Sequence, residues 1–185
     1  MDAGLQMAPG RLEHVREFVN TVDLEHGREE LSSGVALARW LSERGLATGG
    51  IRAGREDLQR AVELREAMRS ILSAHRDGSS PPRSALGTLD RAAQRAQLLL
   101  RFGPDGATTL HPQAGGVDAA LGRLLAIVQE AISQGTWARL KACRQHTCQW
   151  AFYDHSKNRS GSWCKMEVCG NRVKARTYRN RQKQA

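Results

Sequence analysis

The sequence predicts a mainly α-helical protein of the α+β class, with a helical N-terminal domain that contains a small β-hairpin and a smaller C-terminal module that contains the cysteines. Three observations support this prediction. Apolar residues recur at helical spacing in most segments between residues 11 and 134. Strand-like alternation is limited to short stretches, and all four cysteines lie in the last quarter of the chain. A chain of 185 residues has room for one large domain or two small ones.

Five amphipathic segments predict the helices of the N-terminal domain. Ser32 and Ser33 can cap the second helix, and Gly45 is a suitable stop for it. In the third helix the apolar side chains are expected on one face and the charges on the other. The fourth helix is expected to be capped by Ser84 and to bury Leu86 and Leu89. The expected ranges are 11–24, 33–45, 55–75, a segment that begins at 84, and 116–134.

The β-hairpin is predicted over residues 97–111. Its two strands, 97–102 and 107–111, flank a turn with the sequence Gly103-Pro104-Asp105-Gly106. A single hairpin is only marginally stable by itself, so we expect this one to lie against the helices.

Charge divides the chain into two parts. Residues 1–138 contain 16 arginines, no lysine and 17 acidic residues, whereas residues 139–185 contain 12 basic residues and only two acidic ones. A positive field that is so concentrated favours a polyanionic partner, most simply nucleic acid, and the alternative is a tail that only improves solubility. The change in composition predicts a domain of residues 1–136 and a second of residues 137–185.

The sequence has no feature of a membrane or secreted protein. No apolar run approaches the ~20 residues that are needed to cross a bilayer, and the N-terminus lacks the pattern of a secretory signal. We therefore expect a cytoplasmic protein with no membrane partner. In that compartment clustered cysteines indicate a metal or redox role and not disulfides.

The cysteines form the pattern Cys-x4-Cys-x15-Cys-x4-Cys, which consists of two close pairs separated by the length of a short hairpin. Each pair can present two sulfur atoms to one tetrahedral ion, and four cysteines leave no open position for catalysis, so the pattern predicts one structural zinc ion. His146 and His155 are alternative ligands, and a thiol-zinc redox switch is an alternative role for the site. The predicted ligands are Cys143, Cys148, Cys164 and Cys169.

A knuckle, a hairpin and a helix are expected in this order in the C-terminal module, which is the treble-clef arrangement. Cys169 is expected to open the helix, so that the metal orients it. At about 100° per residue, four basic side chains of this helix lie within an arc of ~60°, where they can contact phosphates or base edges. For Arg172, pairing with Asp154 is an equally open alternative. The predicted nucleic-acid-binding residues are Arg172, Lys174, Arg176, Arg179, Arg181 and Lys183.

Both parts resemble known families. The C-terminal module resembles the CGNR zinc finger, and the N-terminal part resembles the ABATE domain. The matching C-terminal motifs are Cys169-Gly170-Asn171-Arg172, Phe152-x-Asp154-x-Ser156-x-Asn158 and Trp163-Cys164-x-Met166. The matching N-terminal motifs are Phe18-Val19-Asn20-Thr21-Val22-Asp23, Trp40-Leu41 and Leu64-Arg65-Glu66.

This resemblance implies a bacterial, stress-related transcription regulator with a mainly helical N-terminal domain and a treble-clef finger. The chain departs from the family at two places: Gly161 and Ser162 stand where a basic pair is usual before Trp-Cys, and Lys157 replaces a common arginine. Contacts from this loop to phosphate are therefore weakened.

Asn20 is the unusual residue of the N-terminal domain, because it interrupts an apolar helical stripe. We expect it to make a hydrogen bond from helix to helix, since buried polar groups must be satisfied. The alternative is a pocket for a small-molecule effector, lined by Asn20, Trp40 and Arg65, which would make the domain a ligand sensor.

The sequence predicts a DNA-binding regulator and not an enzyme. No nucleophile, paired carboxylates or phosphate loop stands out in the helical part. The alternative is a zinc-finger module that binds RNA or protein. The sequence specifies no oligomeric state.

Overall fold

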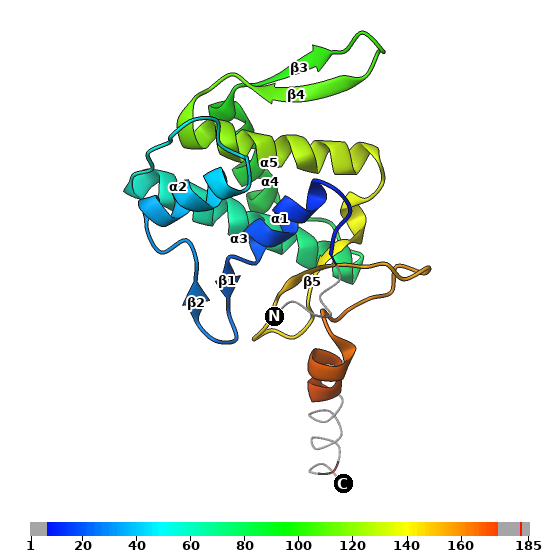
Figure 1. The fold of residues 1–185 in the computed structure, drawn as a ribbon. Helices are drawn as coiled ribbons and strands as arrows, with labels where there is room; N and C mark the ends of the chain where they lie inside the picture. The colour runs from blue at the N-terminus through cyan, green and yellow to red at the C-terminus, as the bar shows by residue number, and fades with distance from the viewer. Residues whose placement is uncertain (1–6, 174–181, 183–185) are drawn as a thin grey trace.

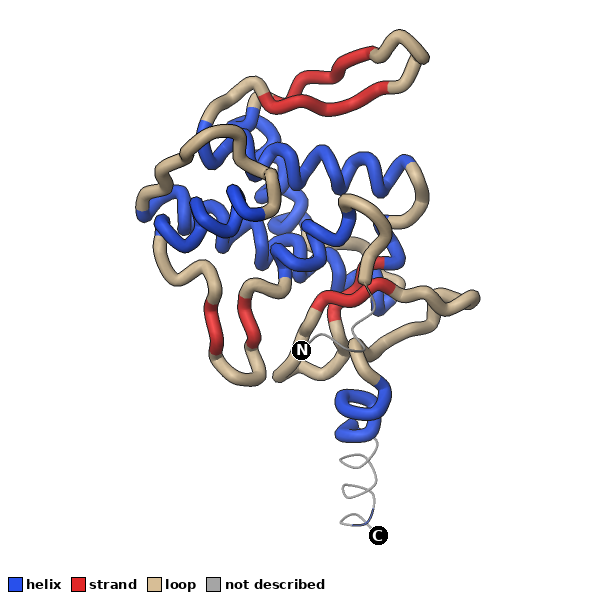
Figure 2. The backbone as a smooth tube through the Cα atoms, in the orientation of Figure 1, coloured by secondary structure: helices blue, strands red, loops and turns tan. Residues whose placement is uncertain are grey.

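The computed structural model describes residues 7–173 and residue 182. Within them, five α-helices form one layered body, and three two-stranded sheets lie at its edges (Figures 1 and 2). This arrangement confirms the mainly helical α+β class. No helix in the described residues is long and apolar enough to cross a membrane. The helices are α1 (Leu12–Val19), α2 (Gly34–Glu43), α3 (Arg55–Asp77), α4 (Arg83–Ala96) and α5 (Gly116–Ser133).

Each sheet is an antiparallel pair of strands that are neighbours along the chain. The pair β3–β4 is the hairpin predicted over 97–111, and the pair β5–β6 lies in the C-terminal module. A 3-10 turn, Trp137–Arg139, precedes β5, and a π-helical turn, Met166–Gly170, lies near the end of the described chain. The strands are β1 (Val22–Asp23), β2 (Arg28–Glu29), β3 (Leu98–Phe102), β4 (Thr108–Pro112), β5 (Leu140–Ala142) and β6 (Ala151–Tyr153).

The first helix is shorter than predicted, because α1 ends at Val19 and not near residue 24. The hydroxyl of Thr21 donates to the carbonyl of Phe18 at 2.9 Å, and the carbonyl of Thr21 accepts from the N–H of Glu30 at 2.8 Å. These bonds replace helical pairing with strand pairing. The chain then forms the β1–β2 hairpin, whose turn contains Gly27 at a φ of +65°.

The second helix begins and ends as predicted, but the fourth does not. The hydroxyl of Ser33 accepts from the N–H of Ala36 at 3.2 Å, which caps α2. In α4, Ser84 lies inside the helix and Leu86 is 42% exposed, whereas Ala96 is fully buried. Ala96 is buried because α4 and α5 approach closely at this point. A Cβ at Gly122 of α5 would lie 2.5 Å from the Cβ of Ala96, so the contact requires small residues.

The third helix departs from the expected division into an apolar and a charged face. Arg65 and Arg69 are each only 3% exposed, and both lie on the inner side of α3 with the apolar residues. Buried guanidinium groups require partners inside the protein. Those partners lie in the β1–β2 hairpin and in the C-terminal module.

One hydrophobic core extends through both parts of the chain. Leu140 of β5, with Ala151 and Tyr153 of β6, belongs to the same buried cluster as the helices. Phe152 points to the other face of β6, where it packs with the four cysteines. The C-terminal module therefore shares its inner face with the helical domain.

Candidate metal centre and nucleic-acid interface

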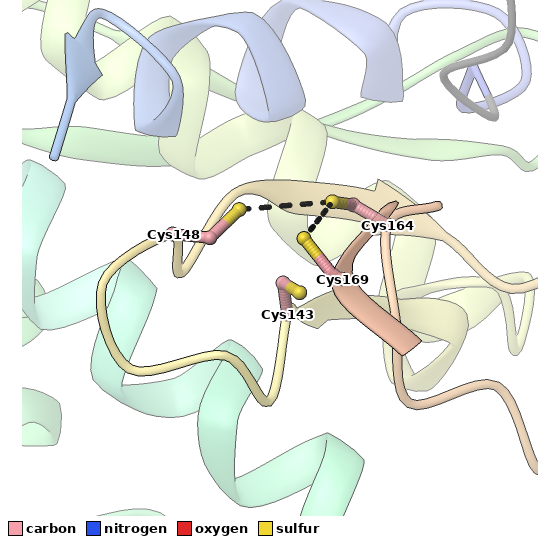
Figure 3. A group of neighbouring side chains, drawn as sticks. All are labelled: Cys143, Cys148, Cys164 and Cys169. Atoms are coloured by element: carbon pink, nitrogen blue, oxygen red, sulfur yellow. Dashed lines mark hydrogen bonds between the residues drawn. The ribbon is translucent and has the colours of Figure 1, made fainter. Parts of the chain in front are cut away.

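The four cysteines converge on one point from separate segments. Cys143 follows β5, Cys148 precedes β6, Cys164 lies in the loop after β6, and Cys169 lies in the π-helical turn (Figure 3). All four Sγ atoms lie within 4.8 Å of one another, and all four residues are buried. The Sγ of Cys164 lies 3.7 Å from each of the Sγ atoms of Cys148 and Cys169.

These distances fit a tetrahedral zinc site. With Zn–S bonds of about 2.3 Å, the edge of a ZnS4 tetrahedron is about 3.8 Å. Thiolate is also a preferred ligand of zinc, and four of them close the coordination shell. The cysteines therefore form a site for one structural zinc ion, as predicted.

The four thiols cannot all ionise together without a counter-charge. Hydrogen bonds from Cys148 and Cys164 lower the pKa of Cys143 to about 2. The same contact with Cys143 raises the pKa of Cys148 to about 12, because a second thiolate beside the first is strongly disfavoured. Four adjacent thiolates thus require a positive charge among them, which a divalent metal ion supplies.

Backbone hydrogen bonds shape the knuckle between the first two ligands. The N–H of Cys143 donates to the carbonyl of Trp150, and the N–H of Cys148 donates to the carbonyl of Gln145, both at 2.9 Å. His146 and His155 do not belong to the metal-binding group: His146 is exposed, and His155 Nε2 donates to the Met7 carbonyl at 3.0 Å.

The last ligand lies in the first turn of the helical segment, as predicted, but this segment begins three residues before Cys169. The π-helical turn begins at Met166, and the N–H of Cys169 already donates to the carbonyl of Lys165 at 2.9 Å. Residues 171–173 continue as helix. Through Cys169, a metal ion bound at this site would hold the first turn of the segment.

A buried ion pair orders the loop that follows β6. Lys141 and Asp154 are 3% and 2% exposed, and Lys141 Nζ lies 2.7 Å from Asp154 Oδ2. Burial by itself would raise the pKa of Asp154, but hydrogen bonds from Lys141, Ser156 and Gly161 outweigh it and lower the pKa to about 2. The carboxylate is thus charged and fully engaged.

This ion pair explains why glycine occupies position 161. The N–H of Gly161 donates to Asp154 Oδ2 at 2.8 Å, and a Cβ at Gly161 would lie 2.7 Å from the Asp154 carboxyl carbon. A basic side chain here would displace that carboxylate. The loop nevertheless presents Lys157 and Arg159, which are both exposed.

Asn20 joins the helical domain to the finger. Its Nδ2 donates to the carbonyl of Ala151 at 2.9 Å, and its Oδ1 accepts from the N–H of Ala151 at 2.7 Å. The side chain therefore pairs with β6 as a neighbouring strand would. The predicted partner, another helix, is wrong, because α1 faces the finger at this point.

Helix α3 holds the finger through three further side chains. Arg69 donates to the carbonyls of Val19 and Gln149, the latter at 2.8 Å. His75 Nδ1 donates to the carbonyl of Leu140. Arg76 donates to the carbonyls of Ala142 and Cys143. Apart from the bond to Val19, all of these bonds end on backbone oxygen atoms in or beside the metal-binding segments.

The three residues of the hypothetical effector pocket have partners within the protein. Asn20 binds the finger. Trp40 packs against Phe18 with 5.6 Å between the ring centroids. The guanidinium carbon of Arg44 lies 4.1 Å from the centroid of the Trp40 ring. Arg65 pairs with Glu29 at 2.8 Å. The effector pocket stays a prediction, and each side chain has a structural use.

The structure describes one of the predicted nucleic-acid-binding residues. Arg172 is half exposed and pairs with Glu25 of the β1–β2 turn. The suggested pairing of Arg172 with Asp154 is wrong, because Lys141 occupies that carboxylate. The other predicted contacts, Lys174, Arg176, Arg179, Arg181 and Lys183, lie outside the described residues.

Sequence reasoning missed the residues that connect the two parts, but one signal was available. At about 100° per residue, Arg65, Arg69 and Arg76 fall within ~40° of one another on α3, beside its apolar face. Arginines in such a row beside an apolar stripe indicate buried, directional contacts. For Glu25 and Lys141 the sequence carries no comparable signal.

Comparison with known families supports the site. Residues 139–182 match the family "CGNR zinc finger". Residues 14–134 match the ABATE family, described as "Putative stress-induced transcription regulator". A search of curated proteins gave no match. With the four-cysteine site in its finger and most of its length matched, the chain belongs to the ABATE family and carries a CGNR zinc finger.

Proposed function

We propose that this chain is a cytoplasmic DNA-binding transcription regulator and not an enzyme. The observation that carries the proposal is the concentration of positive charge on the finger, with 12 basic against two acidic residues from position 139 onward. Such a field attracts the phosphates of a nucleic acid. The regulatory family of the helical domain favours DNA over RNA or protein as the partner.

The finger carries exposed basic side chains on several of its segments. Arg144 and Arg172 are each about half exposed, at 53% and 50% of the side chain, and Lys157 and Arg159 are exposed on the loop after β6. In this proposal the zinc ion and the helical domain fix the directions of these groups. In the same proposal, the basic residues from position 174 onward contact phosphates.

The test is selection of bound sequences from a random DNA pool, with a random RNA pool in parallel. The proposal predicts enrichment of a DNA sequence motif and an affinity that falls by ~0.9 log units per log unit of salt for each neutralised phosphate. Reversing the charges of Arg176 and Arg179 should weaken binding to every duplex. Enrichment from the RNA pool alone would contradict the proposal.

A further inference from the structure

The β1–β2 hairpin of the helical domain reaches the C-terminal helical segment of the finger. Glu25 lies in the turn of this hairpin, and its Oε1 accepts a hydrogen bond from Nη1 of Arg172. The two side chains are 27% and 50% exposed, so the pair lies at the surface. The hairpin and the start of the orange-red C-terminal segment extend from the same side of the helical body (Figure 1).

The hairpin is built to hold Glu25 in place. Asp23 Oδ1 accepts from the N–H groups of Glu25 and His26, both at 3.1 Å. Its Oδ2 binds Arg28 at 2.6 Å and His26 at 2.7 Å. At the base of the hairpin, Glu29 pairs with the buried Arg65 of α3. The base of the hairpin is therefore bound to the core through Glu29, and its turn is held by the hydrogen bonds of Asp23.

We propose that Glu25 is a positioning residue for Arg172 in sequence-selective recognition of DNA, which rests on the function proposed above. The carboxylate binds Nη1, so the guanidinium is held in one direction while Nε and Nη2 can still donate. An arginine that is already ordered loses less side-chain entropy when it binds. Its remaining donors match the two acceptors that guanine presents in the major groove.

The pairing favours a base edge over a phosphate as the partner of Arg172. A guanidinium beside a carboxylate has little net charge left to attract phosphate, but it keeps its directional donors. The negative charge of Glu25 also repels the phosphate backbone of DNA. This repulsion weakens every binding mode in which Arg172 makes no base contact to offset it. Glu25 should thus increase the ratio of selected-site affinity to random-duplex affinity.

The experiment compares variants of the full-length, zinc-loaded protein on the selected duplex and on a random duplex of equal length. Glu25→Gln should weaken binding to the selected duplex by about 2- to 10-fold, the cost of ordering one long side chain, without weakening binding to the random duplex. Glu25→Asp keeps the negative charge, but its shorter side chain no longer reaches Arg172. It should therefore also lower the ratio of selected-duplex affinity to random-duplex affinity. Glu30→Gln, which removes a carboxylate of the same segment away from Arg172, should leave the ratio unchanged.

A double-mutant cycle separates positioning from simple repulsion. Arg172→Gln should lower discrimination at one G·C position by about 5- to 150-fold, and adding Glu25→Gln to it should lower the ratio no further. An equal gain in affinity of Glu25→Gln for both duplexes would overturn the inference, because Glu25 would then only repel DNA. Binding of the wild-type protein to neither duplex would overturn the proposed function as well.

Discussion

Asn20 acts as a short piece of strand edge, since its amide pairs with both backbone polar groups of Ala151. Asn20→Ala leaves these two groups buried without partners, and each such group costs about 1–3 kcal/mol. We expect the variant to lose about 2–4 kcal/mol of unfolding free energy in urea titrations. Asn158→Ala, at an exposed loop position, is the control and should change stability by less than about 0.5 kcal/mol. Equal stability of the two variants would contradict the role of Asn20.

The Lys141–Asp154 pair is a second contact of single residues on which the finger depends. Asp154→Asn leaves the buried ammonium group of Lys141 without its counter-charge, which should cost about 3–5 kcal/mol in urea titrations. A smaller loss than that of Asn158→Ala would show that the pair does not hold the loop.

The sign of the pH dependence follows from the lowered pKa of Asp154. A carboxyl with a folded pKa of about 2 and an ordinary value of 3.8 contributes its stability above about pH 4 and loses it as the pH falls toward 2. The difference in stability between the wild type and Asp154→Asn should therefore be constant between about pH 5 and 8. A difference that shrinks as the pH falls from 8 to 5 would mean that Asp154 titrates within this range.

Among the elements, α3 connects the helical domain to the metal centre. Arg69→Met removes the bonds to the carbonyls of Val19 and Gln149 without emptying the space around the side chain. We expect amide hydrogen exchange in β5 and β6 to become at least about tenfold faster, because about 1.4 kcal/mol of opening free energy is lost. Arg69→Lys should rescue only part of this protection, since lysine lacks the planar fork of donors. Unchanged exchange in both strands would contradict this role of α3.

Local signals in the sequence predicted the elements that local chemistry determines. Ser33 precedes the first residue of α2 and Gly45 follows its end, and the Pro-Gly turn connects β3 to β4. These features could be predicted because caps and turns depend on a few neighbouring residues. The end of α1 could not be predicted, since Thr21 leaves the helix for a partner nine residues later. The metal ligands were predictable because their spacing alone brings four thiols together.

The same limit applies to the contacts between elements. The burial of Arg65 and Arg69 depends on carbonyls and carboxylates from segments far along the chain, and their helical period alone does not name those partners. Arg172 pairs with Glu25, 147 residues away. Long-range pairing of this kind is decided by the assembled fold and not by local propensity.

At the scale of the whole molecule, the shared core makes zinc binding and the folding of both parts interdependent. Leu140, Ala151 and Tyr153 pack into the helical core, so loss of the finger exposes part of that core. Structural zinc contributes about 10–16 kcal/mol in small zinc-finger peptides. Chelation of the metal should therefore lower the melting temperature of the helices, followed by far-ultraviolet circular dichroism, as well as unfold the finger. Helices that melt at the same temperature with and without zinc would show that the two parts are independent.

In the proposed function, zinc holds the finger against the helical domain and so directs its basic surface toward DNA. Fluorescence anisotropy of the selected duplex, measured as zinc is added back to metal-free protein, tests this claim most directly. The affinity for DNA should rise with added metal and saturate at one zinc ion per chain. The same affinity with and without zinc would contradict it.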